Sequence, residues 1–208
     1  MKEIPFFTNT PDDTHCFQAS LKMVLKHFFP ERDFTFEELD EMTDKPANKW
    51  TWPCAGLVAL KRMGLEVRFY AKMDYNEFAE RGVDYIREIY PNDADEMIKN
   101  SDIESEIENA KEMIKHNIFS NEKVELGDAE KWFNQNYLVV LLINSNVLRD
   151  KKGINGHFVV LTGLDEDNVV IHDPGLPPLK NRAVPKELFL KAWRYPKEDY
   201  DTMLFKKV

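Results

Sequence analysis

The chain has 208 residues, of which 43% are hydrophobic and 12% aromatic, and its formal net charge is −9 at pH 7. This length suits one domain, 1–208, and the acidic balance argues against nucleic acid as a partner, because affinity for phosphate backbones depends on Lys and Arg. The longest apolar run, YLVVLLI at 137–143, is far shorter than a membrane span of about 18 residues, and the N-terminus lacks the apolar core of a signal peptide, so we expect a cytoplasmic protein with no membrane partner.

The first half of the chain predicts three helices and a strand. Asp13 or Thr14 can cap a first helix, which carries one apolar stripe and ends at Pro30. The segment FTFEELDEM at 34–42 predicts a short helix with Thr35 as its cap. A helix from residue 54 is then expected to end at Gly64, which suits a left-handed position, before a half-buried strand at 65–71.

The middle of the chain, residues 74–136, is acidic and rich in helix-forming residues. We interpret it as an insertion of two or three surface helices, either packed by one face with the charges in solvent or placed to cover one side of a site.

The last third predicts most of a β-sheet. The run at 137–143 does not alternate, which indicates a strand buried on both faces. GHFVVLTGLDEDNVVIHDP at 156–174 has the pattern of a hairpin with DEDN as its turn. A helix at 185–195 and a strand at 202–208 complete the predicted elements.

Cys16 is the candidate nucleophile, because it falls in the first turn of the first helix. A helix N-terminus and a nearby imidazolium both lower the pKa of a thiol. The chain has one other cysteine, Cys54, to which we assign no role. A Cys16–Cys54 disulfide is an alternative that a cytoplasmic location disfavours.

Two of the five histidines are candidate partners for the thiol, both in the hairpin: His157 and His172. We expect His15 to face solvent, since neighbouring helix residues point in different directions. With a four-residue loop, strand parity places His157 on the same face as His172, whereas a bulge or another loop length places it with Asp173. The residues alone leave both pairings open.

Three segments resemble the peptidase family C39-like proteins: CFQASLKMVL at 16–25, AGLVALKRMGLEVRFY at 55–70, and the hairpin with its Gly-His and Asp-Pro pairs. The resemblance implies an α+β, papain-like cysteine peptidase fold, with a helical side packed on an antiparallel β-sheet and a cleft between them. It also implies that Cys16 is the nucleophile, His157 the general base and acid, and Asp173 the residue that orients His157, with no metal and no organic cofactor.

The chain departs from that family at two positions beside the cysteine. The family has Gln six or seven residues before the cysteine, where its amide donates to the oxyanion; this chain has Asn9 and Thr10, so Asn9 is the oxyanion candidate. Gln18 is a poor substitute, because it points to the far side of the helix. Phe17 replaces a Gly, and we expect Phe17 and Trp52 to line the cleft.

These features support hydrolysis of a peptide or small amide through Cys16, His157 and Asp173. One alternative is a catalytically impaired peptide-binding module that lacks the usual Gln; another is an amidase or transamidase with the same cysteine chemistry. A metal site from Cys16, His15 and the Asp12–Asp13 pair is disfavoured because no ligand spacing recurs, and the absence of a Gly-rich phosphate loop disfavours a nucleotide site. The sequence assigns no oligomeric state.

Overall fold

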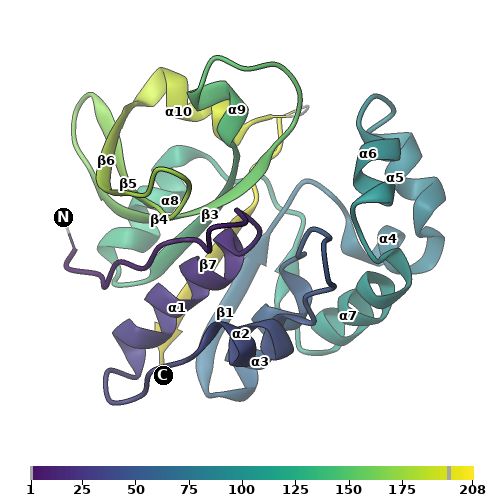
Figure 1. Cartoon of the computed structure of the whole chain (residues 1–208), viewed down its shortest axis with the longest axis horizontal. Coiled ribbons are helices and arrows are strands. Elements are labelled where there is room, and N and C mark those ends of the chain that lie inside the picture. The colour runs from purple at the N-terminus through teal and green to yellow at the C-terminus, as the bar shows by residue number, and fades with distance from the viewer. Residues whose placement is uncertain (1, 196–197) are drawn as a thin grey trace.

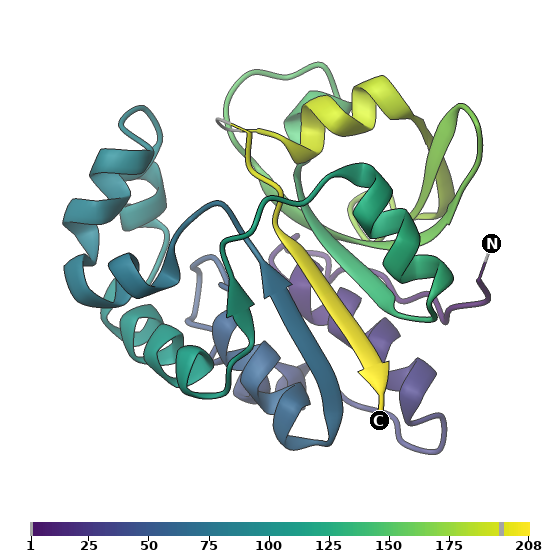
Figure 2. The same ribbon diagram turned by 180° about the vertical axis from the view of Figure 1, so that it is seen from behind.

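The structure, a computed structural model, describes residues 2–195 and 198–208, and over this range it is an α+β fold built on one seven-stranded sheet (Figures 1 and 2). The strand order is β2-β1-β7-β3-β4-β5-β6, and every neighbouring pair is antiparallel except β1 with β2. The strands are β1 (Leu65–Tyr70), β2 (Phe119–Ser120), β3 (Leu138–Asn144), β4 (Gly156–Leu164), β5 (Asn168–Asp173), β6 (Leu179–Pro185) and β7 (Thr202–Lys207).

Local signals account for several helix ends. Thr35 caps the second helix in a capping box with Glu38, and Gly64 has a positive φ after the third helix, both as predicted. The first helix begins at Cys16, later than expected, with His15 at the cap position. The helices are α1 (Cys16–Phe28), α2 (Phe36–Thr43), α3 (Cys54–Arg62), α4 (Tyr75–Arg81), α5 (Val83–Ile89), α6 (Ala94–Lys99), α7 (Ile103–Lys115), α8 (Leu126–Asn134), α9 (Ser145–Leu148) and α10 (Lys186–Trp193).

The sheet separates two hydrophobic cores, because side chains alternate between its faces. Phe158 and Val160 of β4 pack with α1, whereas Val159 and Leu161 of the same strand belong to the core on the other face, together with residues of α8 and α10. β3 and β7 are buried on both faces in the same way, which explains the unbroken apolar run at 137–143. The helical side that carries α1 therefore packs on an antiparallel sheet, as expected.

The helical insertion is shorter and more divided than predicted. It consists of α4–α7, which lie together beside α3 in the part of the chain that is described (Figure 2). Four described helices stand where the sequence predicts two or three surface helices, and Gly82, with φ 52°, separates α4 from α5. The chain then returns to the sheet at β2, and α8 belongs to the layer against β3 and β4, because Ala129 and Phe133 enter that core.

Within the described ranges, we find no helix of the length and apolarity that crossing a lipid bilayer demands.

Candidate active site

The N-terminal segment fixes the start of α1, where Cys16 lies. The Asn9 side-chain oxygen accepts hydrogen bonds from the backbone N–H groups of Thr10 (2.9 Å) and His15 (2.7 Å). The backbone N–H of Asn9 donates to the carbonyl of Pro174 (2.8 Å), which follows β5. Asn9 therefore joins the helix end that carries the thiol to the end of the hairpin.

A bulge in the hairpin decides which residue faces His157. Leu164 pairs with Val169, as the four-residue loop predicts, but the register shifts between Leu161 and Gly163. This shift moves Asp173 to the side of the sheet that His157 occupies. His157 Nε2 lies 2.7 Å from Asp173 Oδ1, and both residues are buried.

Asp173 is held by two further groups that the sequence did not reveal. The Gly175 backbone N–H donates to Oδ1 (3.0 Å), and Arg182 Nη1 donates to Oδ2 (2.8 Å). Burial would raise the pKa of Asp173, but the hydrogen bond and charge of His157, with the hydrogen bonds of Arg182 and Gly175, hold this pKa well below its usual range. Asp173 is therefore an ionised carboxylate in a fixed orientation.

His157 lies between Asp173 and the thiol of Cys16. Burial alone would lower the pKa of His157, but hydrogen bonds with Asp173 and Cys16, and their charges, raise it to about 9. Because Nε2 faces Asp173, Nδ1 is the nitrogen left for the Cys16 sulfur. An imidazolium in this position stabilises a neighbouring thiolate.

His172 is engaged elsewhere. Its Nε2 lies 3.0 Å from the Ile4 carbonyl, and its Nδ1 accepts a hydrogen bond from the Asn181 N–H (3.1 Å). Both ring nitrogens are thus occupied by backbone groups, so His172 has no nitrogen available for Cys16.

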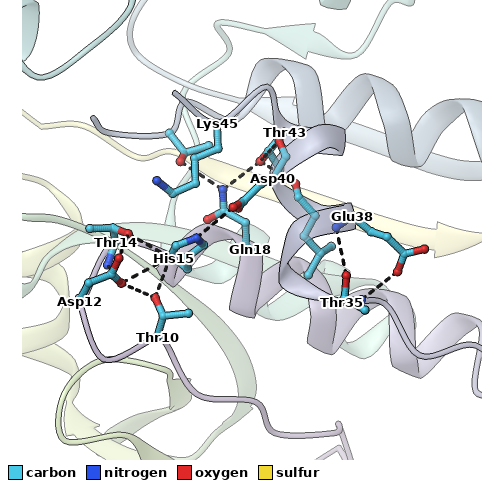
Figure 3. Close-up of polar contacts among 12 residues, drawn as sticks. Thr10, Asp12, Thr14, His15, Gln18, Thr35, Glu38, Asp40, Thr43 and Lys45 are labelled. Atoms are coloured by element: carbon cyan, nitrogen blue, oxygen red, sulfur yellow. Dashed lines mark hydrogen bonds and ion pairs between the residues drawn. The ribbon is translucent and has the colours of Figure 1, made fainter. Parts of the chain in front are cut away.

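The expectation that His15 faces solvent is wrong. Its side chain is only 13% exposed: Nδ1 contacts the Thr10 and Thr14 hydroxyls, and Nε2 lies 3.2 Å from Asp40 Oδ2 (Figure 3). His15 precedes the helix instead of lying within it, and its ring reaches α2. It therefore links the start of α1 to α2.

Gln18 lies on the far side of α1, as expected. It is completely buried, and its amide donates to Thr43 of α2 (2.9 Å) and to Thr51 (3.2 Å).

Asn9 keeps part of its capacity to donate. One amide hydrogen goes to Asp13 Oδ1 (2.7 Å), and the side-chain oxygen is already used by backbone groups, so one amide hydrogen remains. The backbone N–H of Cys16, as the first residue of α1, also has no partner within the helix.

The expectation that Phe17 lines the cleft is wrong. Its ring is 1% exposed and packs 4.5 Å from the ring of Phe158, beneath the sheet. Gly56 of α3 leaves the space that this ring needs, because a Cβ added there would lie 2.9 Å from the ring. The bulky side chain therefore enters the core and does not narrow the site.

Trp52 lines a cavity of about 130 Å³ that borders β4, and the side chains of Cys16, His157 and Asp173 are not among its lining residues. Gly156 and Phe158, the two neighbours of His157, form part of its wall. The remaining lining residues are mostly aromatic or apolar, together with Asp199 and Asp201.

Both thiols are free, and Cys54 is completely buried at the start of α3. Throughout residues 2–195 and 198–208, no three His, Cys, Asp or Glu side chains are placed to hold a metal ion, and this includes the group around Cys16 and His15.

Comparison with solved structures identifies the fold. The peptidase domain of Streptococcus ComA, a bifunctional ABC transporter involved in quorum sensing, matches with a TM-score of 0.52 and 16% identity, over 98% of both chains. A double glycine motif protease from an AMS/PCAT transporter, solved with its leader peptide, matches with a TM-score of 0.52 and 15% identity, over 99% of this chain and 93% of that one. A search of curated proteins found no match.

A family model, DUF3335, described as "Peptidase_C39 like family", matches residues 53–204. The match spans nearly three quarters of the chain and includes His157 and Asp173, whereas Cys16 lies before it. With the papain-like fold of its structural neighbours, this match shows that the chain belongs to the peptidase C39-like family.

Proposed function

We propose that the protein is a cysteine peptidase or amidase that hydrolyses a peptide or small amide. The observation that carries this proposal is the position of His157, whose Nε2 is hydrogen-bonded to the Asp173 carboxylate and whose pKa is raised by Asp173 on one side and by the Cys16 thiol on the other. A nucleophile, a base and a group that orients the base are the parts that acyl transfer by a thiol requires.

The reaction follows from these contacts. His157 Nδ1 takes the proton of the Cys16 thiol, and the thiolate attacks the substrate carbonyl carbon. The resulting oxyanion receives hydrogen bonds from the Cys16 backbone N–H and the remaining amide hydrogen of Asn9. His157 then protonates the leaving amine as the C–N bond breaks, and a water molecule, deprotonated by His157, releases the acyl group from the sulfur. No cofactor takes part in these steps.

The two structural neighbours are a peptidase domain and a protease, which favours a peptide over another amide as the substrate. Two free cysteines favour a reducing compartment, so we propose the cytoplasm as the location. Recovery of the protein in an oxidising compartment by cell fractionation would exclude that location.

Labelling with iodoacetamide tests the site directly, because Cys54 is an internal control. We expect Cys16 to react at least 10-fold faster than Cys54, which is buried and has its pKa raised by burial. We expect His157→Gln to slow the labelling of Cys16 at least 10-fold without a change at Cys54, and Cys16→Ala to leave only the slow reaction. Equally slow labelling of both thiols in the unchanged protein would contradict the proposal.

One observation favours a second function, a peptide-binding module without catalysis. The Asn9 amide is partly used by Asp13, so the oxyanion has one side-chain donor hydrogen at most from this residue. Fast labelling of Cys16 combined with no cleavage of any peptide in a mixed library would favour this function.

A further inference from the structure

The cavity that borders β4 is lined by aromatic side chains and by two carboxyl groups. Trp50, Trp52, Tyr75 and Tyr90 contribute aromatic surface from the loop before α3, from α4 and from the end of α5. Its volume of about 130 Å³ suits one compact group, since a cavity of about 150 Å³ holds benzene.

Two carboxyl groups, Asp199 and Asp201, belong to this largely apolar lining. The Tyr90 hydroxyl donates to Asp199, at 2.9 Å from Oδ2. Both acids are only partly exposed, and a carboxylate beside apolar surface is stabilised by a nearby cation or by several donors. Two acids that share one cavity wall therefore point to a ligand that completes the site.

The pKa values of Asp199 and Asp201 are both raised, which also indicates that their negative charges are poorly compensated. Burial raises the pKa of Asp199 to about 7, although the Tyr90 hydrogen bond and the charge of Lys72 act in the opposite direction. Burial, followed by the charge of Asp199, raises the pKa of Asp201 well above its ordinary value. Within residues 2–195 and 198–208, the other titratable groups that interact with this pair are Cys54, Tyr75, Tyr90 and Tyr200, and none of them carries a positive charge.

We propose that this cavity is a specificity pocket that receives a cationic group of the substrate, such as a lysine or arginine side chain, between its aromatic walls and the Asp199–Asp201 pair. The assignment of this cavity as a substrate pocket rests on the proposed function. Aromatic faces attract cations, and a carboxylate pair supplies the opposite charge. An apolar guest leaves both acids uncompensated, and an anionic guest is repelled by them.

The location is compatible with a substrate pocket. Gly156 and Phe158 line the cavity, and His157 lies between them in β4, although its own side chain is not part of the lining. We infer that a peptide bound at the Cys16–His157 pair can place a side chain around this end of β4 and into the cavity. The same lining includes Met97 of α6, so the insertion helices supply part of the selectivity.

Binding of two matched small molecules tests the pocket without catalysis. Butylguanidinium and butylurea have nearly the same shape, but only the first is charged. We expect the full-length protein to bind butylguanidinium at least 10-fold more tightly in a ligand-observed NMR titration. We expect Asp201→Asn to remove this preference, while Glu166→Gln, in the exposed turn of the hairpin, keeps it. Equal affinity for the two molecules in the unchanged protein overturns the proposal.

The pH dependence of binding provides a second measurement that needs no variant. Because a cation favours the ionised acids, its binding releases protons, so its affinity should rise between pH 6 and pH 8. The affinity of butylurea should stay constant or fall. A butylguanidinium affinity that does not change over this range contradicts the proposal, even if Asp201→Asn fails to fold.

Covalent probes separate this proposal from the proposed function. Peptidyl vinyl sulfones with lysine or norleucine at one of the three positions before the reactive group should inactivate Cys16 at different rates, with lysine at least 10-fold faster at one position. If Cys16 reacts without any preference for lysine, the proposed cation pocket is overturned and the proposed peptidase activity is not. Selective butylguanidinium binding with an unreactive Cys16 leaves the pocket and overturns the peptidase.

Discussion

Arg182 Nη1 lies 2.8 Å from Asp173 Oδ2, so the carboxylate that binds His157 is itself held from the neighbouring strand β6. In the proposed mechanism Arg182 is therefore a positioning residue, which acts on the thiol through Asp173 and then His157. The series of contacts from Arg182 through Asp173 and His157 to Cys16 thus connects β6 with the start of α1.

We expect Arg182→Gln to slow iodoacetamide labelling of Cys16 about 10-fold or more, because Asp173 loses its second anchor and His157 loses its fixed orientation. Arg182→Lys should recover part of the rate, since it retains the positive charge. Arg62→Gln, which removes an exposed ion pair with Glu112, is the matched control and should leave the rate unchanged. A changed His157 NMR titration in Arg182→Gln distinguishes positioning from a general loss of stability.

Gly175→Ala should disturb the His157–Asp173 pair without a change in any reacting group. A Cβ at this position would lie 3.0 Å from Asp173 Oδ1 and 3.2 Å from His157 Nε2. We expect slower labelling of Cys16 and a shifted His157 resonance. Gly127→Ala, where a Cβ meets no atom within 4 Å, is the control. Wild-type labelling in Gly175→Ala would show that the pair tolerates the methyl group.

The titration of His157 should appear in the pH dependence of stability. Its folded pKa, about 9, is raised above the value of about 6.5 for an unfolded chain, so its stabilisation is fully present below pH 6.5 and is lost as pH rises through 9. The maximal slope is about 1.4 kcal/mol per pH unit. Asp173→Asn should reduce this slope in urea unfolding between pH 6.5 and 9, and an unchanged slope would contradict the ion pair.

Gly56→Ala should destabilise the fold although alanine favours helices. The new Cβ would approach Phe17, Leu21 and Thr43 within 2.9 to 3.1 Å, so the core between α1, α2 and α3 must shift. Overpacking of this kind typically costs about 1–3 kcal/mol. Denaturant unfolding measures the change, and Gly127→Ala, which gains helix propensity without a contact, should be neutral or slightly stabilising.

Glu106→Gln should make stability less sensitive to pH. Glu106 is buried, its Oε2 has no partner among the described residues, and burial raises its pKa to about 8. Between pH 4.5 and 8 the folded protein holds a proton that the unfolded chain has lost, so stability falls by about 1.4 kcal/mol per pH unit. The variant lacks this loss, so its advantage should appear above pH 4.5 and level off above pH 8 in thermal unfolding. Parallel curves for both proteins would contradict the raised pKa.

Local patterns were sufficient for much of the fold. The Thr35 cap, the turn at Gly64 and the DEDN hairpin lie where the sequence predicts them, because each depends on residues close together in the chain. The division of residues 75–115 into four helices was not predicted, since a glycine such as Gly82 in a helical pattern also occurs within helices.

The site was harder to predict than the elements that carry it. Cys16, His157 and Asp173 can be recognised in the sequence as candidates. Whether Asp173 or His172 shares a sheet face with His157, however, depends on one bulge near Thr162, and the alternation of apolar and polar residues along a strand does not reveal a bulge. Arg182, Gly175 and the core position of Phe17 depend on contacts between distant segments. A pattern read along the chain contains no information about such contacts.

The last strand, β7, lies in the middle of the sheet, between β1 and β3. During synthesis, β1 can pair with β2, and β3 to β6 can pair with one another. These two groups of strands are joined into one sheet only when residues 202–207 have left the exit tunnel of the ribosome. The complete seven-stranded sheet can therefore form only after this segment has emerged from the ribosome.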